Sequence, residues 1–298
     1  MNPRRPSIFV VACLLFGATM WGIIWYPYRL LMQQGVTGVV SSLFSYAIPF
    51  VLFGWLHRRD VIAARPQWAV LLGIGLAAGW TNMSYVLAVL EGEILRVLLL
   101  FYLAPLWTVL LARLLLNEKL NRWGYAVMAC SITGAMIMLW PPQGGFPLPA
   151  NNAEWLGFSA GVSFAMSNVL TRKAEGASLG AKSVAVWAGV TLVSMTALSI
   201  QANPWDFVAG STALTWGILV GVGLMIAVMT YAVQYGLSHA PANQAIIIFL
   251  FELVVAAVSS YLLANEALNE TEWIGAALII AGSLFSGHIE NTQVESPS

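Results

Sequence analysis

Charged residues are scarce in this 298-residue sequence, at only 9% of the chain, whereas a typical soluble domain carries about 25%. Hydrophobic residues make up 59%. A chain of this kind cannot cover a globular surface with polar side chains, so an ordinary water-soluble fold is excluded. The formal net charge is +0 and no basic patch stands out, so no nucleic-acid partner is expected.

Cysteine and histidine are also rare, with two and three copies, respectively. Cys13 and Cys130 both lie in apolar stretches without CxxC or Cys/His spacing, which argues against a disulfide framework and against a metal site. The sequence also lacks a nucleophile motif, and its GVGLM segment at 221–225 lies inside an apolar stretch rather than after a strand. We therefore expect no cofactor and no enzymatic activity.

What the sequence does contain is a succession of apolar stretches, each close to the roughly 20 residues that cross a bilayer as a helix. Charged, Pro/Gly-rich or Asn-rich interruptions divide it into ten predicted spans: 8–31, 38–57, 67–90, 94–116, 122–140, 153–171, 182–201, 211–236, 242–264 and 271–288. The first span is too long for the apolar region of a signal peptide, so we interpret it as a retained helix. The predicted fold is an all-α membrane protein with ten transmembrane helices.

Segment 141–152, PPQGGFPLPANN, cannot continue a helix because of its proline and glycine content. It is the predicted external linker between a first half, 1–140, and a second half, 153–288, and 289–298 is predicted to be a flexible tail. Cytoplasmic segments carry the excess of positive charge, and with the N-terminus inside, ten of the thirteen Lys and Arg residues are cytoplasmic. Both termini are therefore predicted to be cytoplasmic, in a plasma membrane or bacterial inner membrane.

The two halves of the chain are related in sequence. At an offset of 148 residues, LLARLLLNEKLN (110–121) pairs with VSSYLLANEALN (258–269), and ten of 34 positions are identical over 101–134. Five spans per half would turn the second half upside down, and the charges agree, because Lys119 and Arg122 match Ala267 and Glu270. Inverted repeats that exchange conformations around one central site are a recurring construction of secondary transporters, which is the function predicted here.

Four segments carry a further pattern: GATMWGIIWYPYR (17–29), FYLAPLWTVLLARLLLNEKL (101–120), YGLSHAPANQAIII (235–248) and LLANEAL (262–268). Their distinctive features are Trp21-Gly22, Pro105 and the turns Asn117-Glu118 and Asn265-Glu266. The chain thereby resembles the EamA-type members of the drug/metabolite transporter superfamily. This resemblance implies two five-helix EamA repeats and a gradient-coupled carrier, often an exporter of amino acids or other metabolites. The predicted ninth helix departs from the pattern, because it lacks the usual proline and has Glu252 where the first half has Ala104.

Glu252 is the only acidic residue placed deep within a predicted span, since it lies in the middle of 242–264. An ionised carboxylate at that depth is costly unless it is neutralised, paired or hydrated, so it is a functional candidate by default. We interpret it as a proton-coupling group or as the partner of a substrate amine. A packing residue that is protonated or paired is the structural alternative.

Helical spacing predicts which faces line a substrate cavity, because residues at i, i+3, i+4 and i+7 share one side of a helix. The predicted cavity residues are polar or aromatic: Trp21, Asn82, Tyr85, Tyr102, Ser163, Tyr231, Gln234, Tyr235 and Gln244. Most lie on such faces or near the middle of a span, and Gln244 is opposite Arg96 in the repeat. A place in an interfacial aromatic belt is the alternative for the aromatic residues, and it is the preferred interpretation for Trp25 and Tyr28, near a helix end. The hydroxyls spaced by four residues from Ser159 to Thr171 are interpreted first as a packing face, with cavity lining as the alternative.

Arg96 lies just inside the outer end of span 94–116. Its guanidinium could bind a substrate carboxylate through two parallel hydrogen bonds, or reach to the membrane interface. The two Asn-Glu turns are interpreted as structural, followed by Asn121 and Asn269 as the N-caps of the next helices.

Together these patterns predict a secondary transporter of small organic solutes with apolar or aromatic character, amino acids among them, that works as an exporter. Its expected partners are the substrate, the lipid bilayer and a coupling proton. The alternatives are a channel or scaffold, or a carrier of another class such as a nucleotide-sugar carrier or a drug-efflux carrier.

Overall fold

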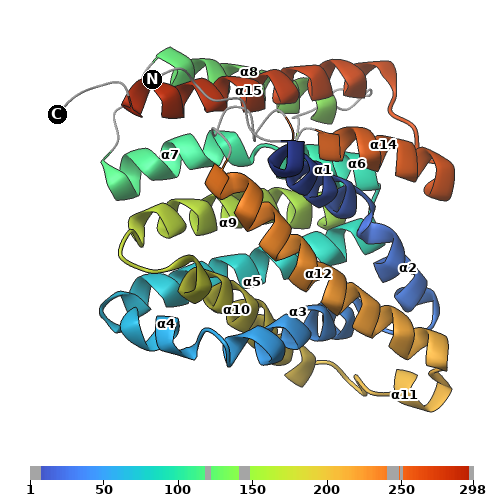
Figure 1. Cartoon of the computed structure of the whole chain (residues 1–298). Coiled ribbons are helices and arrows are strands. Elements are labelled where there is room, and N and C mark those ends of the chain that lie inside the picture. The colour runs from blue at the N-terminus through green and yellow to red at the C-terminus, as the bar shows by residue number, and fades with distance from the viewer. Residues whose placement is uncertain (1–7, 118–121, 141–147, 240–247, 249–250, 295–298) are drawn as a thin grey trace. The chain divides into compact units, whose positions relative to one another are not determined.

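The computed structural model describes residues 8–117, 122–140, 148–239, 248 and 251–294, and within these ranges it contains helices and no strand. The chain forms two compact units (Figure 1). The first unit comprises Met1–Ile24, Lys119–Ala150 and Val228–Ser298, and the second comprises Trp25–Glu118 and Asn151–Ala227. Each unit draws segments from both halves of the sequence, so the units differ from the predicted division into 1–140 and 153–288.

Helices of the first unit pack in pairs through small residues. The unit contains α1 (Ile8–Ile23), α8 (Arg122–Leu139), the end of α12 (Ala213–His239), α14 (Phe251–Ala264) and α15 (Glu270–Val294). Helices α8 and α15, green and red in Figure 1, run side by side, and a Cβ added at Gly134 would lie 2.7 Å from the carbonyl oxygen of Gly275. Small residues allow two backbones to approach this closely. Helix α15 continues past the predicted end at 288 to Val294.

The second unit is built around a long helix, α5 (Trp68–Glu91), which packs against α3, α9 and α10. Its other elements are α2 (Trp25–Gln33), α3 (Gly38–Gly54), α4 (Arg58–Ala63), η1 (Arg65–Gln67), α6 (Ile94–Phe101), α7 (Ala104–Leu116), α9 (Asn152–Lys173), α10 (Leu179–Ser199), α11 (Phe207–Gly210) and the start of α12. Helices α5 and α10 cross at Gly75 and Gly189, where a Cβ added at Gly189 would overlap the backbone of Gly75.

Two predicted spans are broken by proline. A proline has no N–H to donate to the carbonyl four residues earlier, and its ring clashes with that carbonyl. Helix α1 ends at Ile23, four residues before Pro27, and α6 ends at Phe101, four residues before Pro105. The predicted continuous helices 8–31 and 94–116 are therefore each a pair of helices.

Length and hydropathy identify five helices of the described chain that could cross a membrane: Ile8–Gln33, Arg65–Glu91, Ile94–Leu116, Leu179–Ser199 and Ala213–Val233. Shorter apolar helices cover Gly38–Gly54, Tyr125–Ile137 and Phe251–Ala264. The predicted total of ten spans is thus not confirmed.

The two halves of the sequence repeat also share a backbone conformation at matching helix ends. Asn117 follows α7 with φ 55° and Asn265 follows α14 with φ 57°, so both asparagines adopt the left-handed conformation that commonly ends a helix. Asn269 accepts a hydrogen bond from the backbone N–H of Glu272 at 2.9 Å, which confirms its predicted role as the N-cap of α15. Asn121 lies outside the described residues.

Candidate functional site

Beyond its first turn, the buried face of α3 is mostly polar, whereas its half-exposed face carries Leu43, Phe44, Ala47 and Ile48. Six buried residues follow one helical stripe: Gly38, Ser41, Ser42, Ser45, Tyr46 and Pro49. Val39 and Val40, in the first turn, are buried as well. The three serines are fully buried. This stripe was not predicted from the sequence, although its i, i+3, i+4, i+7 spacing is the signal that could have revealed it.

Neighbouring helices extend this stripe into a hydrogen-bonded cluster. The Tyr28 hydroxyl on α2 donates to Ser45 Oγ at 3.0 Å, and Ser45 Oγ donates to the carbonyl oxygen of Ser41 at 2.7 Å. Tyr46 hydrogen-bonds through its side chain to Asn82 on α5. Three helices therefore meet at polar side chains in the interior of the second unit.

Helix α10 adds a fourth wall at the same level. The ring centroids of Phe53 and Trp187 are 5.9 Å apart, and Thr37 Oγ1 donates to Gln201 Oε1 at 3.3 Å. The end of α3 therefore lies beside the first half of α10, and the start of α3 lies beside the end of α10, so the two helices run antiparallel. Ser194 is halfway between Trp187 and Gln201, as Ser45 is halfway between Phe53 and Thr37. Ser194 also shares the face of Trp187, seven residues away.

We call the resulting cluster the polar junction: Tyr28, Ser41, Ser42, Ser45, Tyr46, Asn82 and Ser194. Four of its atoms are almost completely shielded from solvent and have no hydrogen-bond partner among the described residues: Ser41 Oγ, Ser42 Oγ, Asn82 Oδ1 and Ser194 Oγ. An unsatisfied buried polar group costs about 1–3 kcal/mol. The folded chain thus retains, at one level of the unit, polar atoms that a ligand or water would satisfy.

An aromatic group lies next to the polar junction. Tyr85, one helical turn from Asn82 on α5, is buried, and its ring centroid lies 5.5 Å from that of Phe101. The ring of Phe101 also packs against those of Tyr102 and Phe164, with centroid separations of 6.0 and 5.1 Å. Of the residues predicted to line a cavity, the structure therefore brings Asn82, Tyr85 and Tyr102 together in the second unit.

Two other sequence predictions change in the second unit. Trp25 and Tyr28, assigned to the interfacial belt, are each only 1% exposed, so that assignment is wrong. They are buried because α2 packs against α3 and α5. Ser163 is half-buried on α9, and Ser159 on the same face accepts a hydrogen bond from Trp80 Nε1 at 3.2 Å.

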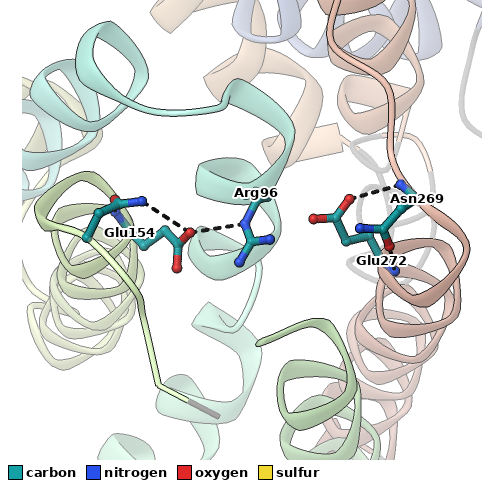
Figure 2. A network of polar contacts seen from close by, with 5 residues as sticks. Arg96, Glu154, Asn269 and Glu272 are labelled. Carbon is teal, nitrogen blue, oxygen red and sulfur yellow. Dashed lines mark hydrogen bonds and ion pairs between the residues drawn. The ribbon is translucent and has the colours of Figure 1, made fainter. Parts of the chain in front are cut away.

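Arg96 has a carboxylate partner inside the chain. Figure 2 shows its Nε on α6 donating to Glu154 Oε1 on α9, at 3.0 Å. Asn151, the N-cap of α9, accepts from the backbone N–H of Glu154 at 2.9 Å. The same figure shows the Glu272 carboxylate accepting a hydrogen bond from the backbone N–H of Asn269, the N-cap of α15. The distance is 2.9 Å. Glu154 thus occupies the capping position that Glu272 has in α15, but its carboxylate binds a second helix.

Glu252 lies on α14, in the first unit, and is half-buried. The part of the predicted span before 251 lies, apart from Ile248, outside the described residues. Helix α1 approaches closely, since a Cβ added at Gly22 would lie 2.8 Å from the carbonyl oxygen of Glu252, and Ser259 Oγ donates to the carbonyl oxygen of Gly22 at 3.2 Å. Trp21, half-buried, precedes this glycine.

The remaining predicted cavity residues belong to the first unit or lie outside the described part of the chain. Tyr231 and Tyr235 on α12 are about two-fifths exposed, and the ring of Tyr235 contacts Phe9 at 5.4 Å. The Gln234 side chain and all of Gln244 lie outside the described residues. Within the described residues, His, Cys, Asp and Glu form no group that could hold a metal ion.

Comparison with known proteins identifies what this chain is similar to. A family model for the EamA-like transporter family matches residues 8–140 and again 151–287. A riboflavin transporter of Rhizobium johnstonii is 26% identical over 100% of this chain and 97% of its own length. An S-adenosylmethionine uptake transporter of Rickettsia bellii is 26% identical over 80% and 77%. A solved crystal structure shares the fold, with a TM-score of 0.60 and 17% identity over 96% of this chain and 99% of that chain.

Proposed function

Because the chain belongs to the EamA-like transporter family, we propose that this multi-pass membrane protein is a secondary active transporter that carries small organic metabolites by alternating access. The observation that carries the proposal is the buried face of α3. Ser41, Ser42 and Ser45 lie on the inner side of a helix whose other side is apolar. Packing alone does not require buried hydroxyls without partners, whereas a polar solute could supply those partners.

Equivalent contacts in the two units support alternating access between inverted repeats. In the second unit, a Cβ added at Gly161 of α9 would lie 2.7 Å from the carbonyl oxygen of Phe101 at the end of α6. In the first unit, Gly22 of α1 makes the corresponding close approach to α14. Spans one and six, and spans four and nine, are partners in the repeat, so each half supplies one helix to each contact. Such paired contacts allow the two halves to exchange conformations.

The substrate class follows from the named relatives. Riboflavin and S-adenosylmethionine both combine a heteroaromatic ring with a hydroxyl-bearing chain or sugar, and we propose a metabolite of this kind for this chain. Amino-acid export, predicted from the sequence, is the competing assignment. It differs from the substrates named for these relatives, one of which is an uptake transporter.

Glu252 is the proposed coupling residue. It is half-buried in an apolar helix, where an ionised carboxylate is costly unless it is neutralised, paired or hydrated. A carboxylate in such surroundings can carry a proton in one phase of the transport cycle and release it in another when that side of the protein opens to water. The Glu252→Gln variant should still bind and exchange substrate but should lose accumulation driven by a pH gradient. Full gradient-driven accumulation in this variant would remove Glu252 from the coupling mechanism.

The proposed orientation, in a plasma membrane or bacterial inner membrane, places both termini in the cytoplasm and segment 141–152 outside. It rests on the distribution of positive charge. Single cysteines at Gln143 and Glu175, in a variant without Cys13 and Cys130, would be exposed to an impermeant maleimide in intact cells. Labelling at position 143 alone is expected, and labelling at position 175 alone would reverse the orientation.

Counterflow in proteoliposomes tests the transport function. Vesicles loaded with unlabelled riboflavin, S-adenosylmethionine or an amino acid are diluted into the labelled compound, and a carrier concentrates the label transiently inside. Accumulation with one of these compounds supports a secondary carrier and identifies its class. Uptake without a counterflow overshoot, which a channel would give, contradicts the proposal.

A further inference from the structure

We propose that the polar junction binds the uncharged O–H and N–H groups of the transported metabolite, and that the aromatic group around Tyr85 receives its ring. This inference rests on the proposed transport function and assigns the substrate-binding residues within the second unit.

Serine in a transmembrane helix usually satisfies its hydroxyl locally, by donating to the carbonyl one turn earlier. Ser45 and Ser84 do so in this structure, at 2.7 and 2.6 Å. Ser41, Ser42 and Ser194 do not, although they are fully buried. These three hydroxyls therefore remain available at one level of the helix bundle.

The hydrogen-bonding character of the junction defines the chemistry of its ligand. Asn82 Oδ1 is an acceptor and requires a donor, whereas a serine hydroxyl can donate or accept. A ligand with several O–H or N–H groups, such as a polyol chain or a ribose, fits this mixture. Water could satisfy one atom at a time, but it would not discriminate between solutes.

The junction selects against charge. Its seven side chains are serine, tyrosine or asparagine, all neutral at physiological pH, and a buried ionic group without a counter-charge is strongly disfavoured. The Arg96 guanidinium and the Glu154 carboxylate, in the same unit, are engaged with each other at 3.0 Å. The part of the ligand that enters the junction is therefore neutral.

The neighbouring rings accommodate a flat heterocycle. Tyr85 and Phe101 meet edge to face, with an interplanar angle of 62° and centroids 5.5 Å apart. Tyr85 lies one turn from Asn82, so a ligand whose hydroxyls reach the junction would place its ring near this pair. Stacking and edge contacts with aromatic side chains favour such ligands.

Two matched pairs of probes separate the hydroxyl contribution from the ring contribution. Riboflavin and lumiflavin share the flavin ring, but lumiflavin lacks the hydroxylated chain. Adenosine and 2′,3′-dideoxyadenosine share the adenine ring and differ in two hydroxyls. Binding of each probe to purified full-length protein is measured by fluorescence or calorimetry for the wild type, Ser42→Ala, Ser194→Ala and the control Ser84→Ala.

The wild type should prefer the hydroxylated member of at least one pair, and Ser42→Ala and Ser194→Ala should each weaken its binding by roughly 2- to 10-fold. The same variants should leave lumiflavin or dideoxyadenosine unaffected, which a general structural defect would not do. Ser84→Ala should bind like the wild type. Because the hydroxyls at 42 and 194 have no partner, their removal should not impair folding.

Two results would overturn the inference. In the first, the wild type binds the hydroxylated probes but Ser42→Ala and Ser194→Ala bind them equally well, so the hydroxyls hold only water and the transport function stands. In the second, none of the four probes binds. If counterflow then succeeds with an amino acid, the substrate class proposed here is wrong although the protein is a carrier. If counterflow fails with every compound, the transport function fails as well.

Discussion

The crossing of α5 and α10 offers a sensitive test of the packing around the polar junction. A Cβ added at Gly189 would meet the backbone of Gly75, which no side-chain rotation can move away. On α12, by contrast, a Cβ added at Gly221 meets nothing within 4 Å. Gly189→Ala and Gly221→Ala therefore form a matched pair that makes the same chemical change in two different surroundings.

The expected difference follows from two opposing contributions. Both variants gain about 1 kcal/mol of helix stability, because alanine is a better helix former than glycine. Only Gly189→Ala bears the cost of overpacking, about 1–3 kcal/mol. The helix-propensity gain cancels in the comparison, so Gly189→Ala should be less stable than Gly221→Ala by about 1–3 kcal/mol.

Unfolding in detergent, followed by tryptophan fluorescence during denaturant titration, measures this difference. Asn82 and Ser194 lie beyond the crossing on the same two helices, so separating the helices should also weaken the binding of a hydroxylated probe. Equal stability of the two variants would show that α5 and α10 do not approach as closely as described, and would refute the reasoning.

Two further predictions concern polar contacts. Glu154→Gln should lower stability by about 1–3 kcal/mol, because it leaves the Arg96 guanidinium without its counter-charge, and the exchanged pair Arg96→Glu/Glu154→Arg should recover part of the loss. Thermal unfolding of the single and double variants checks this, and a double variant less stable than either single one would contradict a direct pairing. Tyr28→Phe should cost about 1 kcal/mol, since it removes the hydrogen bond to Ser45 while keeping the ring, and the same assay should find no cost if that bond is absent.

Local features of the chain were accessible from the sequence because they depend on composition and short-range spacing. Apolar stretches predicted membrane helices, the 148-residue repeat predicted two related halves, and Asn265 and Asn269 were correctly taken as structural residues at a helix end. The family resemblance, carried by motifs such as Trp21-Gly22, was confirmed by the two EamA matches. The breaks at Ile23 and Phe101 were also implicit, because each follows from a proline four residues later.

Interactions between distant segments were decided only by the tertiary structure. The sequence could not show that Arg96 would meet Glu154, because the two residues come from different helices and are 58 positions apart. Burial of Tyr28 depends on how α2 packs, so its position near a helix end was misleading. The polar junction is the clearest case: helical spacing alone could place Ser41 and Ser42 on one face. Only the packing of four helices decides that this face is buried, and that its hydroxyls lack partners.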